Sequence, residues 1–186
     1  DSLRLRIEAE KKSADIAETL ISPKYLNEFA GIVLGKFMDI TDSQLGAFYL
    51  YRTDESRFEP LAAIGVNPEL LGTFDATIFE GEFGKTLKTG EISHITHISK
   101  ETVFTFKTFA GTAIPREMIT LPVVVKNEVS AMICLASLGE YSKAALTILS
   151  QPAIIALNTA FANLLANEET RKLAEELREI NQELHA

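Results

Sequence analysis

The chain has 186 residues, enough for one ordinary domain with helical extensions, and its 46% hydrophobic and 24% charged residues are typical of a globular protein. A net charge of −8, with acidic and basic residues intermixed, argues against nucleic acid as a direct partner. The single cysteine excludes a disulfide framework and a cysteine-rich zinc site. We find no signal-peptide pattern and no apolar stretch of membrane-spanning length, so we expect a cytoplasmic piece without direct membrane contact, from a parent chain that could itself be membrane-anchored.

The N-terminal segment is rich in good helix formers and contains neither Gly nor Pro up to Leu20. One a/d frame, interrupted by Glu10, predicts a helix with a weak coiled-coil seam formed by Leu3, Ile7, Ala14, Ala17 and Ile21. Ser22 and Pro23 fit the start of a second helix, as N-cap and first helical residue. That helix should run to about Met38 and present an apolar face.

The next segment has strand character. Residues 44–51 and 58–64 flank a polar connection and predict an antiparallel hairpin. A short strand around residues 74–78 precedes a helix over residues 80–88, with Gly90 just beyond its end.

Residues 92–95 predict another short strand, and residues 99–115 have no clean period and predict a long loop. Apolar runs at residues 118–126 and 129–138 flank Asn127-Glu128 and predict a second hairpin in the middle of the sheet. Cys134 lies within the second run, where a thiol would behave as a small buried hydrophobe.

The C-terminal segment, residues 142–186, predicts mostly helix, with Pro152 near its start or at a kink. Towards its end an apolar row alternates spacings of four, three and four, at Leu173, Leu177, Ile180 and Leu184. This heptad pattern favours a coiled coil over an isolated surface helix. The chain starts without Met and stops inside this helix, so we expect a fragment whose output activity lies outside it.

Several local patterns resemble the GAF domain. Residues 80–91, E-G-E-F-G-K-T-L-K-T-G-E, are similar to its glycine-flanked helix entry and Thr-Gly-Glu turn. Residues 116–123, R-E-M-I-T-L-P-V, are similar to its Arg-Ser-x-x-x-x-Pro-Leu strand, with Glu117 replacing a small residue. Residues 129–138 followed by Tyr141-Ser142 resemble its last strand and exit helix, and the order of elements agrees over residues 23–166.

The resemblance implies an α+β fold of the GAF-like (PAS-like) type, an antiparallel sheet flanked by helices with long N- and C-terminal signalling helices. It divides the chain into an N-terminal signalling helix (1–22), a sensor domain (23–166) and a coiled-coil connector (167–186). It implies a non-catalytic sensor that binds a small molecule and signals through dimeric helices to an output domain in cis, such as a histidine kinase. A dimerisation or spacer module whose cavity is filled by its own side chains is the alternative, and a metal or redox catalyst is a third.

The resemblance also places a lid over the cavity at residues 102–113, whose phenylalanines and threonines suit a small-molecule pocket. The candidate ligand-binding residues are Phe79, Phe83, Phe104, Phe106, Phe109, Thr112 and Arg116. For the lid phenylalanines Phe104, Phe106 and Phe109, burial in the core is the favoured interpretation, because aromatic side chains gain strongly from burial. Arg116 and Lys107 could recognise a carboxylate or pair with Glu117 or Glu101. The candidate dimerisation residues are Leu3, Ile7, Leu173, Leu177, Ile180 and Leu184.

We identify no catalytic residue, metal site or cofactor. On a strand, His94 and His97 would lie three apart and so on opposite faces, which is poor geometry for a shared metal. Gly81 and Gly84 could open a helix N-terminus to an anion, but shaping a tight turn is the favoured interpretation. GAF members that attach bilins or reduce free methionine sulfoxide need cysteines that this chain does not match, and the cyclic-nucleotide motif is not evident, so the ligand stays open.

Overall fold

The computed structural model describes residues 2–20, 23–79, 81–102, 104–108, 111–150 and 152–185. Its helices are α1 (Ser2–Leu20), α2 (Leu26–Thr41), α3 (Gly81–Thr89), α4 (Lys143–Ser150) and α5 (Pro152–Leu184), with a 3₁₀ turn η1 (Pro68–Leu70). Its strands are β1 (Leu45–Arg52), β2 (Arg57–Ile64), β3 (Phe74–Asp75), β4 (Ser93–Ile95), β5 (Phe106–Thr108), β6 (Gly111–Ala113), β7 (Glu117–Val125) and β8 (Glu128–Ser137).

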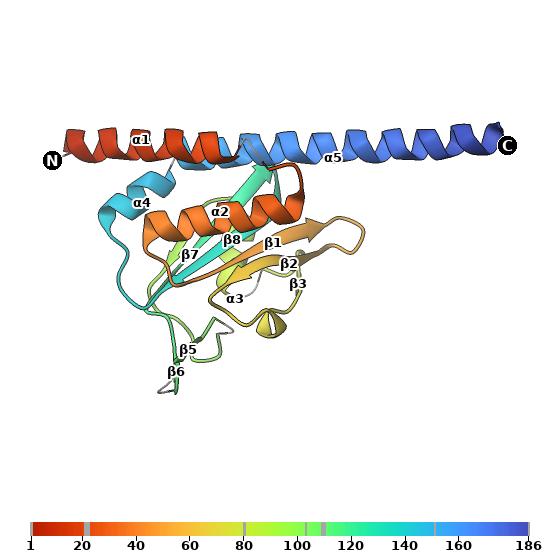
Figure 1. Cartoon of the computed structure of the whole chain (residues 1–186). Coiled ribbons are helices and arrows are strands. Elements are labelled where there is room, and N and C mark those ends of the chain that lie inside the picture. The colour runs from red at the N-terminus through yellow and green to blue at the C-terminus, as the bar shows by residue number, and fades with distance from the viewer. Residues whose placement is uncertain are drawn as a thin grey trace.

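Six strands form one antiparallel sheet in the order β3-β2-β1-β8-β7-β4. α2, α4 and α5 lie on one side of this sheet with α1 outside them, and α3 lies on the other side (Figure 1). β5 and β6 pair separately, in a small hairpin that projects from the domain. The α+β fold expected from the sequence, an antiparallel sheet flanked by helices, is confirmed.

Both faces of the central strands are covered, which explains their near-continuous apolar runs. On β1, Phe48 packs into the core beneath the helices, whereas its neighbour Tyr49 packs into the core beside α3. β8 alternates in the same way, with Ile133 on the helical side and Cys134 on the other. Cys134 is fully buried, as predicted.

Two connections differ from the sequence-based expectation. The β7–β8 turn is Lys126-Asn127, one residue earlier than predicted, with φ of 52° and 65° at the two positions. Positive φ at both central residues is the type I′ geometry that matches strand twist. Residues 99–115 are not a continuous loop, because β5 and β6 pair within them, and the strand expected at residues 74–78 is shortened to β3.

α2 begins at Leu26, not directly after Ser22 as predicted, and Pro23 precedes the helix. Ser22 lies outside the described residues. Tyr25 occupies the N-cap position with extended backbone and provides no side-chain cap. Instead, the N–H of Leu26 donates to Glu168 Oε1 of α5 at 3.3 Å. A carboxylate at a helix N-terminus is favourable, so a residue far along the chain supplies the missing cap.

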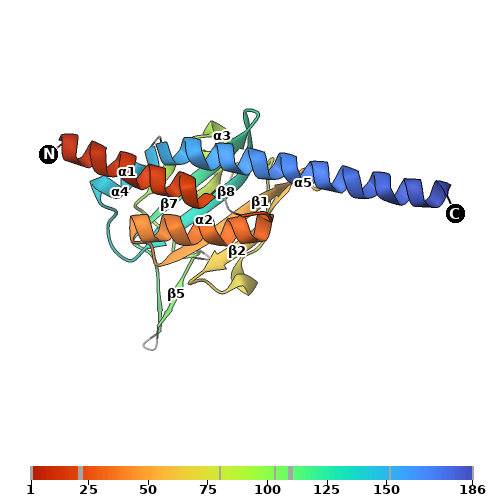
Figure 2. The ribbon, with the colours of Figure 1, turned by 45° about the horizontal axis from the view of Figure 1, so that its top comes forward.

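α1 lies alongside the first part of α5, and both helices run in the same direction (Figures 1 and 2). The residues of α1 buried against the domain are Ala9, Ser13, Ile16 and Leu20. This is not the predicted apolar frame, of which Leu3, Ile7 and Ala14 remain exposed. The start of α1 and the end of α5 extend beyond the domain in opposite directions.

By length and composition alone, the helical stretch Lys143–Leu184 could cross a membrane, because it contains an 18-residue window with a mean hydropathy of 1.4. This differs from the expectation that no stretch of that kind occurs. Three of its largest apolar side chains, Leu149, Leu157 and Phe161, are buried in the core beneath the helices. Core helices of globular proteins satisfy the same criterion for the same reason.

Candidate functional site

An aromatic cluster fills the space between the sheet and α3, on the side where the resemblance places the ligand cavity. Phe74 stacks on Phe58 and on Phe83, with ring centroids 5.0 and 4.5 Å apart. Tyr49 packs against Phe74 and Phe83 at 5.1 and 5.3 Å, and Phe104 meets the edge of Phe83 at 6.3 Å. Such contacts stabilise beyond the burial of their area, so this cluster is a packed core that a ligand would have to displace or border.

The structure brings only part of the predicted ligand site together. Phe83, Phe104 and Phe106 all belong to the core beside α3. Phe79 is exposed, and so are Thr112 on the projecting hairpin and Arg116 at the start of β7. Phe109 lies outside the described residues. The proposed ligand contacts therefore stay a prediction.

An open groove of about 560 Å³ borders the aromatic cluster. Its lining includes Tyr51, Phe58, Phe79, Lys88 and Asn127. Among the predicted ligand residues that the structure describes, Phe79 alone lines it. The remaining lining residues could not be predicted from the sequence, because they come from segments that only the fold brings together, among them β1, β2, α3 and the β7–β8 turn. The volume of the groove lies in the range of small-molecule sites, and its lining mixes apolar and polar side chains.

Two glycines shape the entry to α3 beside this groove. Gly81 has a φ of 65°, and a Cβ added at Gly84 would lie 2.4 Å from the carbonyl of Phe79. Both positions need glycine for backbone geometry alone, which supports the tight-turn interpretation.

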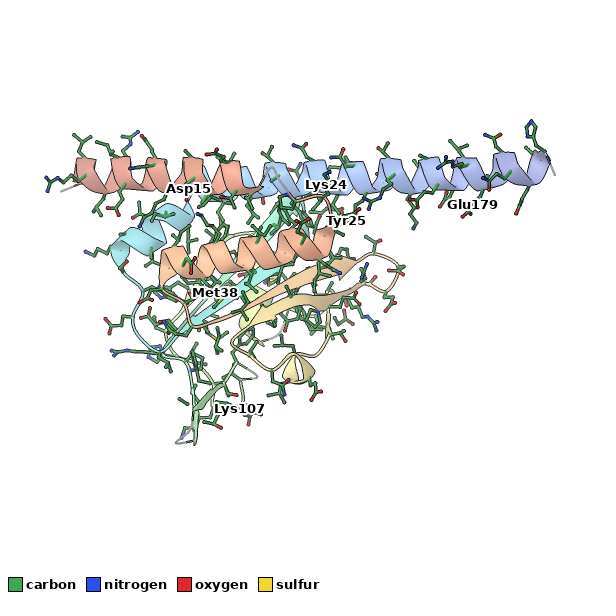
Figure 3. The ribbon with its side chains drawn as sticks, viewed as in Figure 1. Asp15, Lys24, Tyr25, Met38, Lys107 and Glu179 are labelled. Carbon is green, nitrogen blue, oxygen red and sulfur yellow. The ribbon has the colours of Figure 1, made fainter. Side chains whose placement is uncertain are left out.

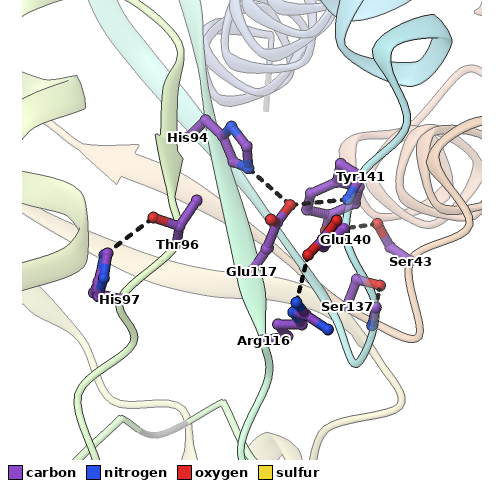
Figure 4. A network of polar contacts seen from close by, with 10 residues as sticks. Ser43, His94, Thr96, His97, Arg116, Glu117, Ser137, Glu140 and Tyr141 are labelled. Atoms are coloured by element: carbon purple, nitrogen blue, oxygen red, sulfur yellow. Dashed lines mark hydrogen bonds and ion pairs between the residues drawn. The ribbon is translucent and has the colours of Figure 1, made fainter.

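A second polar cluster surrounds Glu117, which is only 8% exposed (Figure 4). Its Oε2 accepts the N–H of Tyr141 at 2.8 Å and lies 2.9 Å from Nε2 of His94. The Tyr141 hydroxyl lies 3.0 Å from Ser43 Oγ, which in turn contacts Thr41 at the end of α2. The cluster thus joins β4, β7, the entry to α4 and the end of α2.

Opposing effects act on the Glu117 carboxyl. Burial alone raises its pKa, but the Tyr141 N–H, the His94 side chain and the charges of His94 and Arg116 together hold the pKa below its ordinary value. Burial also raises the pKa of Tyr141 well above its usual range, so its hydroxyl stays protonated. Arg116 pairs with Glu140, not with Glu117 as one prediction had it.

The two histidines have different partners, and only His94 belongs to this cluster. His94 pairs with Glu117, and His97 Nδ1 lies 3.1 Å from Thr96 Oγ1 on the far side of β4. Within the described part of the chain, no group of three His, Cys, Asp or Glu side chains could hold a metal ion. The arrangement is a hydrogen-bonded cluster that links separate elements of the fold, and Glu117 lies at its centre. Glu117 is also the residue that departs from the GAF resemblance.

The candidate dimerisation residues form exposed apolar positions at both ends of the helical layer. On α5, Leu173, Leu177, Ile180 and Leu184 are 54%, 61%, 53% and 75% exposed. On α1, Leu3 and Ile7 are exposed as well. Exposure of a regular apolar row on a helix that has left its domain is typical of an interaction surface.

Where α5 leaves the domain, it contacts Tyr25 and Leu26 at the start of α2 (Figure 3). Besides the bond from Leu26 to Glu168, the guanidinium of Arg171 lies 4.9 Å from the ring of Tyr25 and 3.7 Å from Glu168. Beyond Glu168, every described residue of α5 is exposed. These contacts therefore mark the last attachment of α5 to the domain.

The six-stranded antiparallel sheet with helices on both sides has the GAF fold. Among solved structures, the GAF domain of an Acinetobacter phosphoenolpyruvate-protein phosphotransferase is 21% identical, with a TM-score of 0.65 over 84% of this chain and 93% of that chain. Residues 122 to 287 of a methyl-accepting chemotaxis protein are 15% identical, with a TM-score of 0.60 over 84% and 99%.

A third similar structure is the free methionine-R-sulfoxide reductase of Neisseria meningitidis in complex with its substrate. It is 12% identical to this chain, with a TM-score of 0.64 over 82% of this chain and 87% of that chain. No protein-family model and no curated protein sequence matches the chain. These similarities support the fold predicted from the sequence.

Proposed function

We propose that this chain is a regulatory sensor module that binds a small molecule beside the aromatic cluster and signals through paired helices to an output domain outside it. The observation that carries the proposal is the continuity of α5 from Pro152 to Leu184. Its first part buries Leu157 and Phe161 in the core, and its last part exposes the apolar row. A change in core packing would therefore act on α5, the same continuous helix that we propose pairs with a second copy.

The in-line geometry of the terminal helices suits a module placed between other parts of a receptor. α1 enters from one end of the domain and α5 leaves at the other. A chemotaxis protein is among the similar structures, which favours a signalling role. We propose a cytoplasmic homodimer, with a histidine kinase-like domain as the output in cis.

For the ligand site we propose the groove at Tyr51, Phe79 and Lys88. The hairpin that carries Lys107, within the predicted lid, does not line this groove. Aromatic side chains supply the apolar wall, and Lys88 supplies a positive charge at the rim. The candidates Phe83 and Phe104 support that wall from the core.

Catalysis by this chain is not part of the proposal. The reductase among the similar structures acts on methionine sulfoxide, whereas the lone cysteine here, Cys134, is 0% exposed in the middle of β8. A buried thiol in apolar surroundings is a poor nucleophile. The Glu117 cluster likewise has its carboxylate satisfied from within the fold.

The aromatic cluster itself favours the second candidate function, a dimerisation or spacer module without a ligand. Its rings are in continuous contact and fill the side of the sheet where the GAF cavity is expected. In that case the paired helices would only hold other domains at a fixed distance.

A thermal-shift screen of metabolites separates the two functions. The sensor proposal expects a hit whose stabilisation is lost in Phe79→Ala, which removes a groove side chain that is 55% exposed. Ile78→Ala is the matched control, because Ile78 is similarly exposed but does not line the groove. A hit must also change crosslinking across Leu177, since a ligand signals only if it binds two helix arrangements differently. Absence of any hit favours the spacer.

A further inference from the structure

The apolar row of α5 lies on the side of the helix opposite its buried face. The buried residues of its first half are Ala153, Leu157, Phe161 and Leu164. At 3.6 residues per turn, the row from Leu173 to Leu184 lies about 180° round the helix from them. Ile155, which is 64% exposed, continues the row over the domain. A partner helix on this row would therefore meet no part of the domain, and two domains would lie on opposite sides of a helix pair.

The charges beside the row are one-sided. In the heptad, Leu177 and Leu184 take a positions, and Leu173 and Ile180 take d positions. The g positions are then acidic throughout, at Glu169, Glu176 and Glu183, and the e positions are uncharged, at Asn167, Ala174 and Asn181. All six are exposed.

These flanking rows distinguish the two possible directions of pairing. In an antiparallel pair g faces g′, so Glu176 would lie beside Glu183 of the other copy, twice in each dimer. In a parallel pair g faces e′, so Glu176 would lie beside Asn181 and Glu169 beside Ala174. Like charges directly opposite each other destabilise a helix pair, so the sequence disfavours the antiparallel arrangement.

The placement of α1 gives the same answer independently. Leu3 and Ile7 are exposed at one end of the helical layer, and the α5 row is exposed at the other end. In an antiparallel pair the two α1 segments would point away from each other. Only a parallel two-fold pair brings like ends together, so that the apolar residues at both ends can be covered in one assembly.

We propose that α5 pairs in parallel with α5 of a second copy, with the acidic g row setting the direction. This inference rests on the proposed dimeric function and goes beyond it by assigning orientation and register. Leu177 and Leu184 meet their own counterparts in successive a layers. Signals then leave both copies at the same end of the assembly.

Cysteine crosslinking of the full chain tests the orientation. Leu184→Cys alone forms an intermolecular disulfide if the pair is parallel, because position 184 faces itself, and Leu173→Cys alone does the same. In an antiparallel pair only a mixture of the two variants crosslinks, since position 184 then faces position 173. The wild type is the control, with Cys134 buried away from the seam.

Native mass spectrometry on the same samples distinguishes failure of the proposed dimeric function from failure of the parallel orientation. A monomer at high concentration contradicts the proposed dimeric function. A dimer that crosslinks only in the mixture, or at neither position, leaves that function standing and overturns the parallel pairing on this row.

A charge variant gives an independent measure. Asn181→Lys places an ammonium beside Glu176 of the partner in the parallel pair and should tighten dimerisation about 2- to 10-fold at low salt. Gln182→Lys adds the same charge at an exposed f position away from the seam and should leave the dissociation constant unchanged. Equal effects of the two substitutions would contradict the parallel arrangement.

Discussion

Replacing Glu117 by Gln tests how much the buried Glu117 cluster, which contacts the entry to α4, contributes to the stability of the domain. The carboxylate accepts the Tyr141 N–H at 2.8 Å and pairs with His94 at 2.9 Å, while only 8% exposed. Hydrogen bonds to a charged group stabilise by about 1 kcal/mol more than neutral ones. Glu117→Gln keeps the shape but removes the acceptor's charge from both bonds, so we expect it to lower the free energy of unfolding by about 2 kcal/mol at neutral pH.

The pH dependence of this loss has a definite sign. The pKa of Glu117 is lowered in the folded state, so its contribution is fully present above the unfolded value of 4.5 and is lost as the pH falls through the folded value. The gap between wild type and Glu117→Gln should therefore narrow as the pH is lowered from about 6 to about 3. Urea unfolding followed by circular dichroism at several pH values measures this gap.

Glu140→Gln is the matched control, because Glu140 is a neighbouring carboxylate whose pairing with Arg116 is exposed to solvent. Exposed ion pairs contribute about 0–1 kcal/mol, so this variant should stay close to wild type. The reasoning is refuted if Glu117→Gln is as stable as Glu140→Gln at neutral pH, or if its deficit is the same at every pH.

Three further predictions concern the other parts of the site. Leu177→Ala should weaken self-association at least about tenfold, since burying a leucine is worth about 2 kcal/mol, whereas Arg178→Ala should not; sedimentation equilibrium compares them. Glu168→Ala should cost about 1 kcal/mol and speed hydrogen exchange in the first turn of α2, because the Leu26 N–H loses its acceptor; Glu169→Ala should leave that exchange unaltered. Phe83→Ala should destabilise the domain by about 3 kcal/mol in thermal or urea unfolding by breaking the stack with Phe74, while Phe79→Ala, at an exposed position, should cost about 0.5 kcal/mol or less.

The elements that the sequence predicts well are those defined by local patterns. The β7 and β8 strands are continuous apolar runs, and Gly90, with a φ of 66°, follows α3 as a helix C-terminus requires. The row at Leu173 and Leu177 has the period of a helix, and the helix there extends without a break. In each case the residues that carry the signal are neighbours in the chain.

The features that escaped prediction depend on contacts between distant segments. α2 starts at Leu26 because Glu168 caps it from α5, which no pattern near Ser22 and Pro23 could indicate. The sequence could not indicate that Glu117 bonds to His94 and Tyr141, because these partners lie in β4 and before α4.

The same limit applies to α1 and to the groove. α1 buries Ala9 and Ser13, because small residues allow close packing against the domain. The spacing of large apolar residues instead predicts the frame with Leu3 and Ile7. The groove lining comes from β1, β2, the β3–α3 connection, α3 and the β7–β8 hairpin, which are separate in sequence.

β1 offers a direct physical link between the two sides of the domain. Tyr49 belongs to the aromatic cluster beside the groove, and its neighbour Phe48 points to the opposite face of the sheet, as alternation on a strand requires. Phe48 packs against Phe161 of α5 with ring centroids 6.1 Å apart, and Phe29 of α2 packs against both.

A ligand that displaces the rings around Tyr49 must therefore shift β1, or else its binding is opposed by the packing of β1. Closely packed side chains do not deform gradually, so a shift of β1 would repack Phe161 and turn α5 as one body. Because α5 is unbroken from Phe161 to Leu177, such a turn would rotate the apolar row relative to its partner. The close ring packing that fills the aromatic cluster would thus also couple a small ligand to the helix pair.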